Sequence, residues 1–216
     1  TLIQQTVIMD ERTIQLAKQY MKKASENIPK TDRLPVKLPE SQQQSAAVLL
    51  GIYGAMVESR DMELQLDEGT LAKVDKVVKW MYESRKRGLL LCGTLGNGKT
   101  TMLRSLKQFF GMKASYYEAQ VVYDCYRQNR TFPQNGQNEI LLLDDLGVEP
   151  ATYNDFGEIR YPLAEFLMKR YKNNLPTIIA TNLTFEDIGK VYGDRLQDRM
   201  REMFAMITYK EQSYRR

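Results

Sequence analysis

Short apolar runs alternate with amphipathic segments through the last two thirds of the chain. Five apolar runs are predicted to be β-strands, at residues 89–92, 114–117, 140–143, 177–181 and 204–209. Between them, apolar side chains recur every three or four residues, which is typical of helices covering a core. Predicted helices span residues 70–84, 101–110, 119–128 and 156–171, and a last helical stretch ends near residue 202. This alternation predicts an α/β fold with a parallel sheet covered by helices on both faces.

The first sixty residues have a different pattern. Residues 10–27 are predicted to form a helix with a thin apolar stripe, and Pro29, Pro35 and Pro39 then indicate a linker. A second helix is predicted over residues 41–60, either packed on the main domain or part of a partner-binding module. We therefore expect a small helical N-terminal region with a Pro-rich linker at residues 1–60, as a candidate for partner binding, and an α/β domain at residues 61–216.

Residues 93–100 read GTLGNGKT, the G-x-x-x-x-G-K-T pattern, between a predicted strand and a predicted helix. Glycines let the backbone N–H groups face phosphate oxygens, and the helix N-terminus adds a favourable dipole. Lys99 is suited to reach the β- and γ-phosphates, and the Thr100 hydroxyl is suited to ligate Mg²⁺. The residues expected to contact the nucleotide are Gly93, Thr94, Leu95, Gly96, Asn97, Gly98, Lys99, Thr100 and Thr101. A plain glycine turn is the alternative; the flanking elements favour a nucleoside triphosphate site.

The strand at 140–143 leads into two consecutive carboxylates, Asp144 and Asp145. Open α/β sheets bind ligands at the carboxyl ends of their strands, so these acids are expected beside the phosphate loop. Asp144 is predicted to hold Mg²⁺ and Asp145 to orient and deprotonate an attacking water. Asn182 follows the strand at 177–181 and is predicted to hold that water or to sense the γ-phosphate. The alternatives are local backbone hydrogen bonds for the two acids and a turn cap for Asn182.

Arg195 and Arg199 lie one helical turn apart in the sequence GDRLQDRMRE. They form either a solvated salt-bridge face with neighbouring acids or an arginine finger aimed at the γ-phosphate of an adjacent subunit. Spacing alone favours the salt-bridge face.

Composition excludes several other kinds of chemistry. The chain of 216 residues has no histidine, which removes Ser-His-Asp and Cys-His catalysis and every histidine metal site. Cys92 and Cys125 lack zinc-finger spacing and are expected to be reduced thiols of a cytoplasmic protein. No apolar stretch is long enough to span a membrane. The net charge of +4 allows a nucleic-acid partner without indicating one.

In its motif series, the chain resembles the DnaC/IstB-like helicase-loader branch of the AAA+ ATPases. The series GTLGNGKT, LLLDDLG, LPTIIATN, GDRLQDRM and a terminal SYR agrees in order and spacing from about Asp61 to Arg216. The resemblance implies a five-stranded parallel sheet with the P-loop strand near its centre, and no C-terminal lid domain. It also implies ATP and single-stranded DNA as ligands, self-association into a ring or helical oligomer, and a replicative helicase gripped by the N-terminal region.

The resemblance also assigns roles to individual residues. It makes residues 93–100 Walker A, Asp144 and Asp145 Walker B, Asn182 sensor 1, Arg199 the arginine finger with Arg195 adjacent, and Arg215 the sensor 2 arginine. Asp145 stands where most AAA+ proteins carry glutamate, and its shorter side chain is expected to slow hydrolysis.

The function expected from the sequence is ATP hydrolysis coupled to loading a replicative helicase onto single-stranded DNA. An IstB-type transposition ATPase shares every core motif, and an ATP-sensing module with little turnover is also compatible with Asp145. A GTPase would carry an N-K-x-D motif, which is not found in the sequence.

Overall fold

The computed structural model describes residues 15, 18–20, 34–128 and 140–209. The chain divides into two compact units, Thr1–Asp32 and Arg33–Arg216, and the elements below all belong to the second. Most of the helix expected at residues 10–27, and the proposed sensor 2 residue Arg215, lie outside the described residues.

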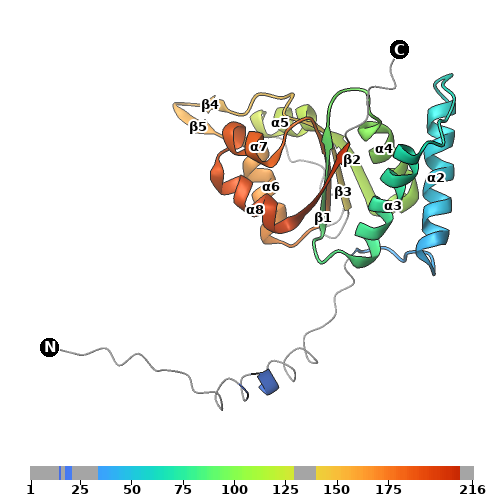
Figure 1. The fold of residues 1–216 in the computed structure, drawn as a ribbon. Coiled ribbons are helices and arrows are strands. Elements are labelled where there is room, and N and C mark those ends of the chain that lie inside the picture. The colour runs from blue at the N-terminus through green and yellow to red at the C-terminus, as the bar shows by residue number, and fades with distance from the viewer. Residues whose placement is uncertain (1–14, 16–17, 21–33, 129–139, 210–216) are drawn as a thin grey trace. The chain divides into compact units, whose positions relative to one another are not determined.

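The second unit is built on a parallel sheet of five strands in the order β2-β3-β6-β1-β7 (Figure 1). The strands are β1 (Gly88–Gly93), β2 (Ala114–Glu118), β3 (Ile140–Leu146), β6 (Thr177–Thr181) and β7 (Phe204–Tyr209). Apolar side chains fill both faces of the inner strands, and Leu89, Leu90 and Leu91 of β1 have no exposed surface. The predicted α/β class, with a parallel sheet of five strands and the P-loop strand inside it, is confirmed.

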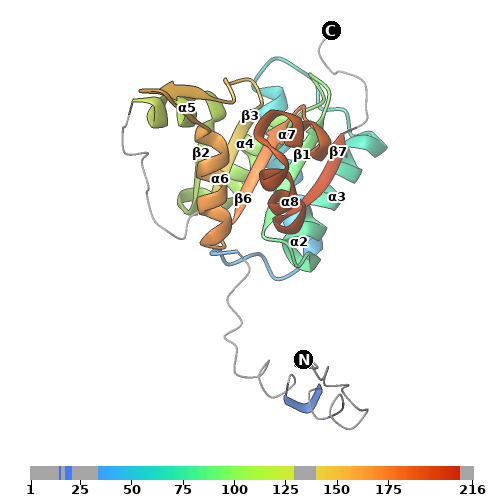
Figure 2. The same cartoon turned by 90° about the vertical axis from the view of Figure 1, so that its left-hand side faces the viewer.

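Helices cover both faces of this sheet, as Figures 1 and 2 show. One face carries α2 (Gln42–Glu58), α3 (Glu68–Glu83) and α4 (Lys99–Phe110), which a short 3₁₀ turn, η1 (Gly111–Lys113), follows. The other face carries α5 (Ala119–Arg127), α6 (Pro162–Lys172), α7 (Phe185–Tyr192) and α8 (Asp194–Met203). The sheet therefore separates two hydrophobic cores.

Helix α2 packs on the main domain, which is one of the two alternatives for the helix expected at 41–60. Leu49 and Tyr53, one turn apart, are buried in the core shared with α3 and α4. Arg60, just beyond the helix, donates from Nη1 to the Thr101 hydroxyl at 3.1 Å. The boundary expected at residue 60 thus lies inside the compact unit, which begins at Arg33.

A β-hairpin replaces the beginning of the helix expected over residues 156–171. Strands β4 (Tyr153–Asp155) and β5 (Glu158–Arg160) pair in antiparallel fashion. Phe156 and Gly157 form the two-residue loop with positive φ angles of 50° and 98°, as a primed hairpin turn requires. Helix α6 then begins at Pro162, whose fixed φ suits the first helical turn.

Candidate nucleotide-binding site

The loop between β1 and α4 has the backbone shape that phosphate binding needs. Gly96 and Gly98 adopt φ angles of 80° and 89°, which side chains rarely tolerate. A Cβ atom on Gly98 would also lie 2.5 Å from the Tyr53 hydroxyl of α2. Both glycines are therefore required by the local geometry, and the loop ends at the N-terminus of α4, where a helix favours anions.

Lys99, the first residue of α4, folds back over this loop. Its Nζ donates to the carbonyl oxygens of Gly93 and Thr94, both at 2.7 Å, and to Asn97 Oδ1 at 3.3 Å. The side chain is only 7% exposed, so the ammonium group is held inside the cradle that the P-loop forms. A bound phosphate would exchange some of these carbonyl acceptors for charged oxygens, which make stronger hydrogen bonds.

Asn97 connects the phosphate loop to β7 and to α3 by hydrogen bonds. Its fully buried side chain donates from Nδ2 to the carbonyl of Tyr209, at the end of β7, at 3.1 Å. Its own carbonyl accepts from Lys73 Nζ of α3 at 3.3 Å. These contacts hold the phosphate loop between β7 and α3, so its shape exists before a ligand arrives.

Two oxygen-bearing side chains meet beside the start of α4. Thr100 donates from its hydroxyl to Asp144 Oδ1 at 3.3 Å, and Asp144 is 1% exposed. Tyr116 of β2 donates to Asp144 Oδ2 at 2.6 Å. Burial, followed by this hydrogen bond, raises the pKa of Tyr116 to about 12, so its hydroxyl keeps its proton at neutral pH. A hydroxyl and a carboxylate are the oxygen ligands that Mg²⁺ takes, so the residues present fit that ion.

A break in the pairing of β3 and β6 separates Asp144 from Asp145. The register shifts between Leu143 and Leu146, which adds one residue to β3. Asp145 occupies that position with φ 55°, and its side chain is exposed while that of Asp144 is buried. The bulge therefore directs two consecutive carboxylates into different surroundings, as the two roles predicted for them require.

Asn182 follows directly after β6 and is exposed. Thr181, the last residue of that strand, donates from its hydroxyl to the Leu146 carbonyl at 2.6 Å and ties β6 to the bulged end of β3. Because β3, β6 and β1 are neighbours in a parallel sheet, their carboxyl ends lie at one edge. The sheet thus brings the P-loop, the two aspartates and Asn182 to the same edge.

A buried carboxylate, Glu149, lies just beyond β3 and was not predicted from the sequence. Glu149 accepts from the Gly147 N–H at 3.0 Å and from the hydroxyl of Tyr192, the last residue of α7. Burial raises the pKa of Glu149, and also that of Tyr192. This contact joins the loop after β3 to the α7–α8 junction.

Tyr116 and Lys73 were also missed as parts of the site. They lie far along the chain from the motifs that they support, and no spacing rule links them to those motifs. For Glu149, the only signal was an acid in an otherwise apolar stretch after the strand.

The arginines of α8 do not join the P-loop of their own chain. Arg199 donates to Glu202 Oε2 at 3.1 Å, lies 3.7 Å from Asp198, and stacks over the Tyr171 ring with its Cζ 5.5 Å from the centroid. Tyr171 belongs to the last turn of α6, which leads into the amino end of β6. Arg199 therefore lies near the edge of the sheet opposite the P-loop, whereas Arg195 is exposed.

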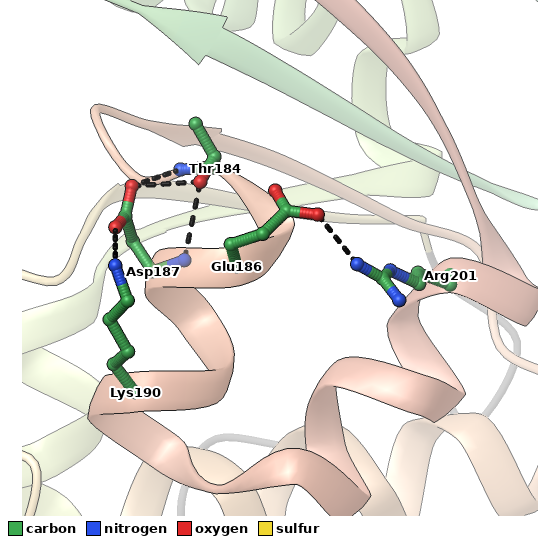
Figure 3. A network of polar contacts seen from close by, with 5 residues as sticks. All are labelled: Thr184, Glu186, Asp187, Lys190 and Arg201. Atoms are coloured by element: carbon green, nitrogen blue, oxygen red, sulfur yellow. Dashed lines mark hydrogen bonds and ion pairs between the residues drawn. The ribbon is translucent and has the colours of Figure 1, made fainter.

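An ion pair at the surface joins α8 to α7, beside a capping network at the start of α7, as Figure 3 shows. Thr184 and Asp187 form a capping box at the start of α7, and Lys190 pairs with Asp187 at 3.3 Å. Arg201 of α8 donates to Glu186 of α7 at 2.6 Å.

Within the described ranges, no three histidine, cysteine, aspartate or glutamate side chains gather as they would around a metal ion. None of the helices that the structure describes is both long and apolar enough to cross a bilayer.

The sheet order, the P-loop sequence and the acidic end of β3 together define a P-loop NTPase fold. Three solved structures of similar fold are DnaI, DnaA from Aquifex aeolicus bound to AMPPCP, and domain III of the replication initiation protein DnaA from Thermotoga maritima. Their TM-scores are 0.48, 0.46 and 0.45, and their sequence identities are 22%, 18% and 15%, in the same order.

The extent of these matches differs. They cover 70%, 68% and 69% of this chain, and 88%, 48% and 65% of the other chains. The chain thus spans about half of the Aquifex aeolicus DnaA chain. No protein-family profile matches the sequence, and no curated protein is significantly similar to it. Likeness at this level describes the fold alone.

Proposed function

We propose that this protein binds ATP with Mg²⁺, hydrolyses it, and uses that cycle to load a replicative DNA helicase onto single-stranded DNA. The observation that carries the ATPase part is the joint placement of Lys99, Thr100 and Asp144 around one phosphate loop. Each side chain is already oriented by the fold, as a preorganised electrostatic site requires.

Different residues of the site would bind different parts of the nucleotide. Lys99 neutralises the β- and γ-phosphate oxygens, while the N–H groups at the start of α4 donate to them. Thr100 and Asp144 would hold Mg²⁺, which supplies charge neutralisation at the phosphates when bound. Tyr116, by donating to one oxygen of Asp144, leaves the other oriented toward Thr100.

Hydrolysis needs a group that positions and deprotonates water, and Asp145 takes this role in the proposal. Its carboxylate is exposed at the end of β3, beside the end of β6 that carries Asn182. Asn182 would hold the water by its amide, and Asp145 would accept the proton. Arg199, distant from its own P-loop, is proposed to act on the γ-phosphate of a neighbouring copy.

The helicase-loading part rests on the motif series rather than on geometry. The order of Walker A, Walker B, sensor 1 and arginine motifs resembles the helicase-loader branch, and residues 1–60 are proposed to contain the grip on the helicase. Single-stranded DNA and self-association belong to the same proposal.

The ATPase part is tested by Lys99→Ala, with Lys107→Ala as a matched control on the same helix. Lys107 lies in the last turn of α4, and its Nζ donates to the Gly111 carbonyl, away from the loop. We expect Lys99→Ala to raise the dissociation constant for Mg²⁺–ATP by at least about tenfold and the control to leave it unchanged. Equal affinity of the two variants would contradict the assignment of the site.

The loading part is tested with the full chain, the replicative helicase of the same cell and circular single-stranded DNA. We expect the chain to bind the helicase and to increase, in an ATP-dependent manner, the amount of helicase that encircles the DNA. Lys99→Ala should lose that increase. A chain that hydrolyses ATP but neither binds the helicase nor changes its loading would retain the ATPase assignment and refute the loading role.

A further inference from the structure

The β4–β5 hairpin presents an aromatic side chain to solvent. Phe156, at its tip, is fully exposed, and Ile159 of β5 is 62% exposed. In Figure 1 the hairpin projects beyond the helices that cover its face of the sheet. The tip reads Asp155-Phe156-Gly157-Glu158, so the phenyl ring is flanked by two carboxylates. Exposing such a ring on a rigid two-residue turn favours a role in contact with another surface.

A pocket on the same unit combines apolar walls with positively charged side chains, and so complements the hairpin tip. It measures about 520 Å³ and lies between α6 and the α7–α8 junction. Ala164, Met168 and Leu196 give it apolar walls, and the cations Lys169, Lys172 and Arg195 also line it. A Phe side chain fits comfortably in this volume, and aromatic anchors in such pockets supply much of the binding energy at interfaces.

The charge around the pocket is mainly positive. Its single acid, Glu165, is held by Arg160, which donates from Nε at 2.9 Å and from Nη2 at 2.6 Å. This pairing neutralises the carboxylate and lowers its pKa. The pocket thus carries three cations and the tip two carboxylates, Asp155 and Glu158, and opposite potentials of this kind guide specific association.

The positions of the two surfaces relate them to the nucleotide site. The hairpin is the next paired element after β3, and β4 begins eight residues after Asp145. The pocket includes Arg195, and Arg199 lies one turn further along the same helix. Contact between the tip of one copy and the pocket of another would therefore bring α8 of the second copy toward the Walker B end of the first.

From this geometry we propose that the chain self-associates by inserting Phe156 of one copy into the α6–α8 pocket of the next. The occupant is a second copy of this chain. Because tip and pocket are different surfaces, the contact is heterologous and can propagate into a ring or helix. The inference deepens the proposed function and rests on it only for the catalytic consequence, namely that Arg199 approaches the neighbouring nucleotide.

Paired cysteines test the contact directly in the full chain with Cys125 replaced by serine; Cys92 is buried. One protein carries Phe156→Cys, and a second, of different length through a tag, carries Met168→Cys. Mixed with Mg²⁺–ATP under mild oxidation, they should form the mixed disulfide dimer. Met112→Cys, 94% exposed beyond α4, replaces Phe156→Cys as the control and should give little of it. A yield no higher than that of the control overturns the proposal.

Charge reversal supplies a second, independent measurement by sedimentation velocity. Asp155→Lys with Glu158→Lys reverses the tip, and Lys169→Glu with Lys172→Glu reverses the pocket. Each pair should raise the dissociation constant for self-association by about tenfold or more, and all four changes together should restore it to within about threefold. Phe156→Asn, which tolerates the positive φ, should weaken association similarly. Failure of the four changes to restore association overturns the docking.

ATP binding to each variant separates this inference from the proposed function. None of these side chains belongs to the P-loop, so the affinity for a fluorescent ATP analogue should be the same in all. Intact ATP binding without the cross-link refutes the docking alone. A cross-link in a protein that binds no ATP refutes the ATPase assignment and leaves the docking standing.

Discussion

Asp145 adopts a left-handed backbone conformation at the point where β3 leaves its regular pairing with β6. Asparagine tolerates the same conformation, so Asp145→Asn changes the charge and proton affinity of the side chain with little effect on the backbone. We expect this variant to bind ATP within about twofold of the unmodified chain and to hydrolyse it about 10² times more slowly or worse, since a general base is lost.

The measurement is single-turnover hydrolysis at saturating ATP, alongside equilibrium binding. Asp145→Glu is the informative control, because it retains a carboxylate and should retain turnover. Hydrolysis by Asp145→Asn at the unmodified rate would remove Asp145 from the role of base.

We expect ionisation of Glu149 to lower the free energy of unfolding as the pH rises. Burial raises its pKa in the folded chain above the ordinary glutamate value of 4.5. The folded state therefore binds this proton more tightly than the unfolded state, and the resulting stability is lost as pH rises from about 4.5 through the raised pKa. Glu149→Gln cannot ionise, so its free energy of unfolding should fall less over this interval. Urea titrations at pH 5 and pH 7 would measure the difference.

Glu165→Gln serves as the control for this prediction. Arg160, by hydrogen bonding, lowers the pKa of Glu165, so the pH dependence that this residue contributes falls below pH 4.5. Glu165→Gln should leave the difference in the free energy of unfolding between pH 5 and pH 7 the same as in the unmodified chain. If Glu149→Gln also leaves that difference unchanged, the buried carboxyl does not titrate in this interval.

At the scale of elements, the sequence predicts the strands well because each is a continuous apolar run. The strand expected at 177–181 coincides with β6, and that at 204–209 coincides with β7. The P-loop was equally readable, because its chemistry depends on adjacent residues such as Gly98 and Lys99. Asp144 and Asp145 were predicted from their place after a buried strand.

What the sequence did not reveal depends on contacts between distant segments. Tyr116 reaches Asp144 only because β2 and β3 pair in register, and residues 118 and 144 are opposite one another in that pairing. The helical spacing of apolar residues in 156–171 predicted a helix over the whole segment. The turn at Phe156 and Gly157 is a weaker signal in the sequence, so the hairpin was not predicted. The apolar pattern of α2 shows that Leu49 and Tyr53 need a partner surface. It does not show that this surface is formed by α3 and α4 of the same chain.

The packing of α2 gives a prediction about truncation. A chain starting at Arg33 keeps the whole compact unit, whereas one starting at Asp61 loses α2 and uncovers the side of α3 and α4 that Leu49 and Tyr53 bury. Two such side chains correspond to about 3–6 kcal/mol of burial. We expect residues 33–216 to unfold cooperatively at a urea midpoint close to that of the full chain, and residues 61–216 to unfold at much lower urea. Equal midpoints would show that α2 adds little to stability.

At the scale of the whole molecule, the groups proposed to act in catalysis lie in two separate parts of the surface. The P-loop, the aspartates and Asn182 lie at the carboxyl edge of the sheet, whereas Arg199 stacks on Tyr171 near the opposite edge. In its own chain Arg199 is one member of an exposed cluster with Glu202 and Asp198, a kind of ion pair that adds little stability. This arrangement suits a cation that serves another copy, and it also suits a simple surface ion pair, so an experiment on mixed copies is needed.

Mixing two inactive proteins distinguishes these roles of Arg199. Arg199→Ala should bind ATP normally and hydrolyse it at least about tenfold more slowly, because charge on the transferring phosphoryl group loses its partner from the neighbouring copy. Asp145→Asn should be slow because its own site lacks the base. In a mixture, some contacts pair an intact Asp145 site with an intact Arg199, and these should hydrolyse ATP.

The ATPase rate of the mixture, with single-stranded DNA and the helicase present, should therefore exceed the average of the two separate rates. Arg201→Ala is the matched control on α8, since it removes an exposed pair with Glu186 and should keep near-normal activity alone. Co-sedimentation of differently tagged variants establishes that they assemble together. If they do so without any gain in rate, Arg199 acts within its own chain or only as a surface ion pair, and the shared site is refuted.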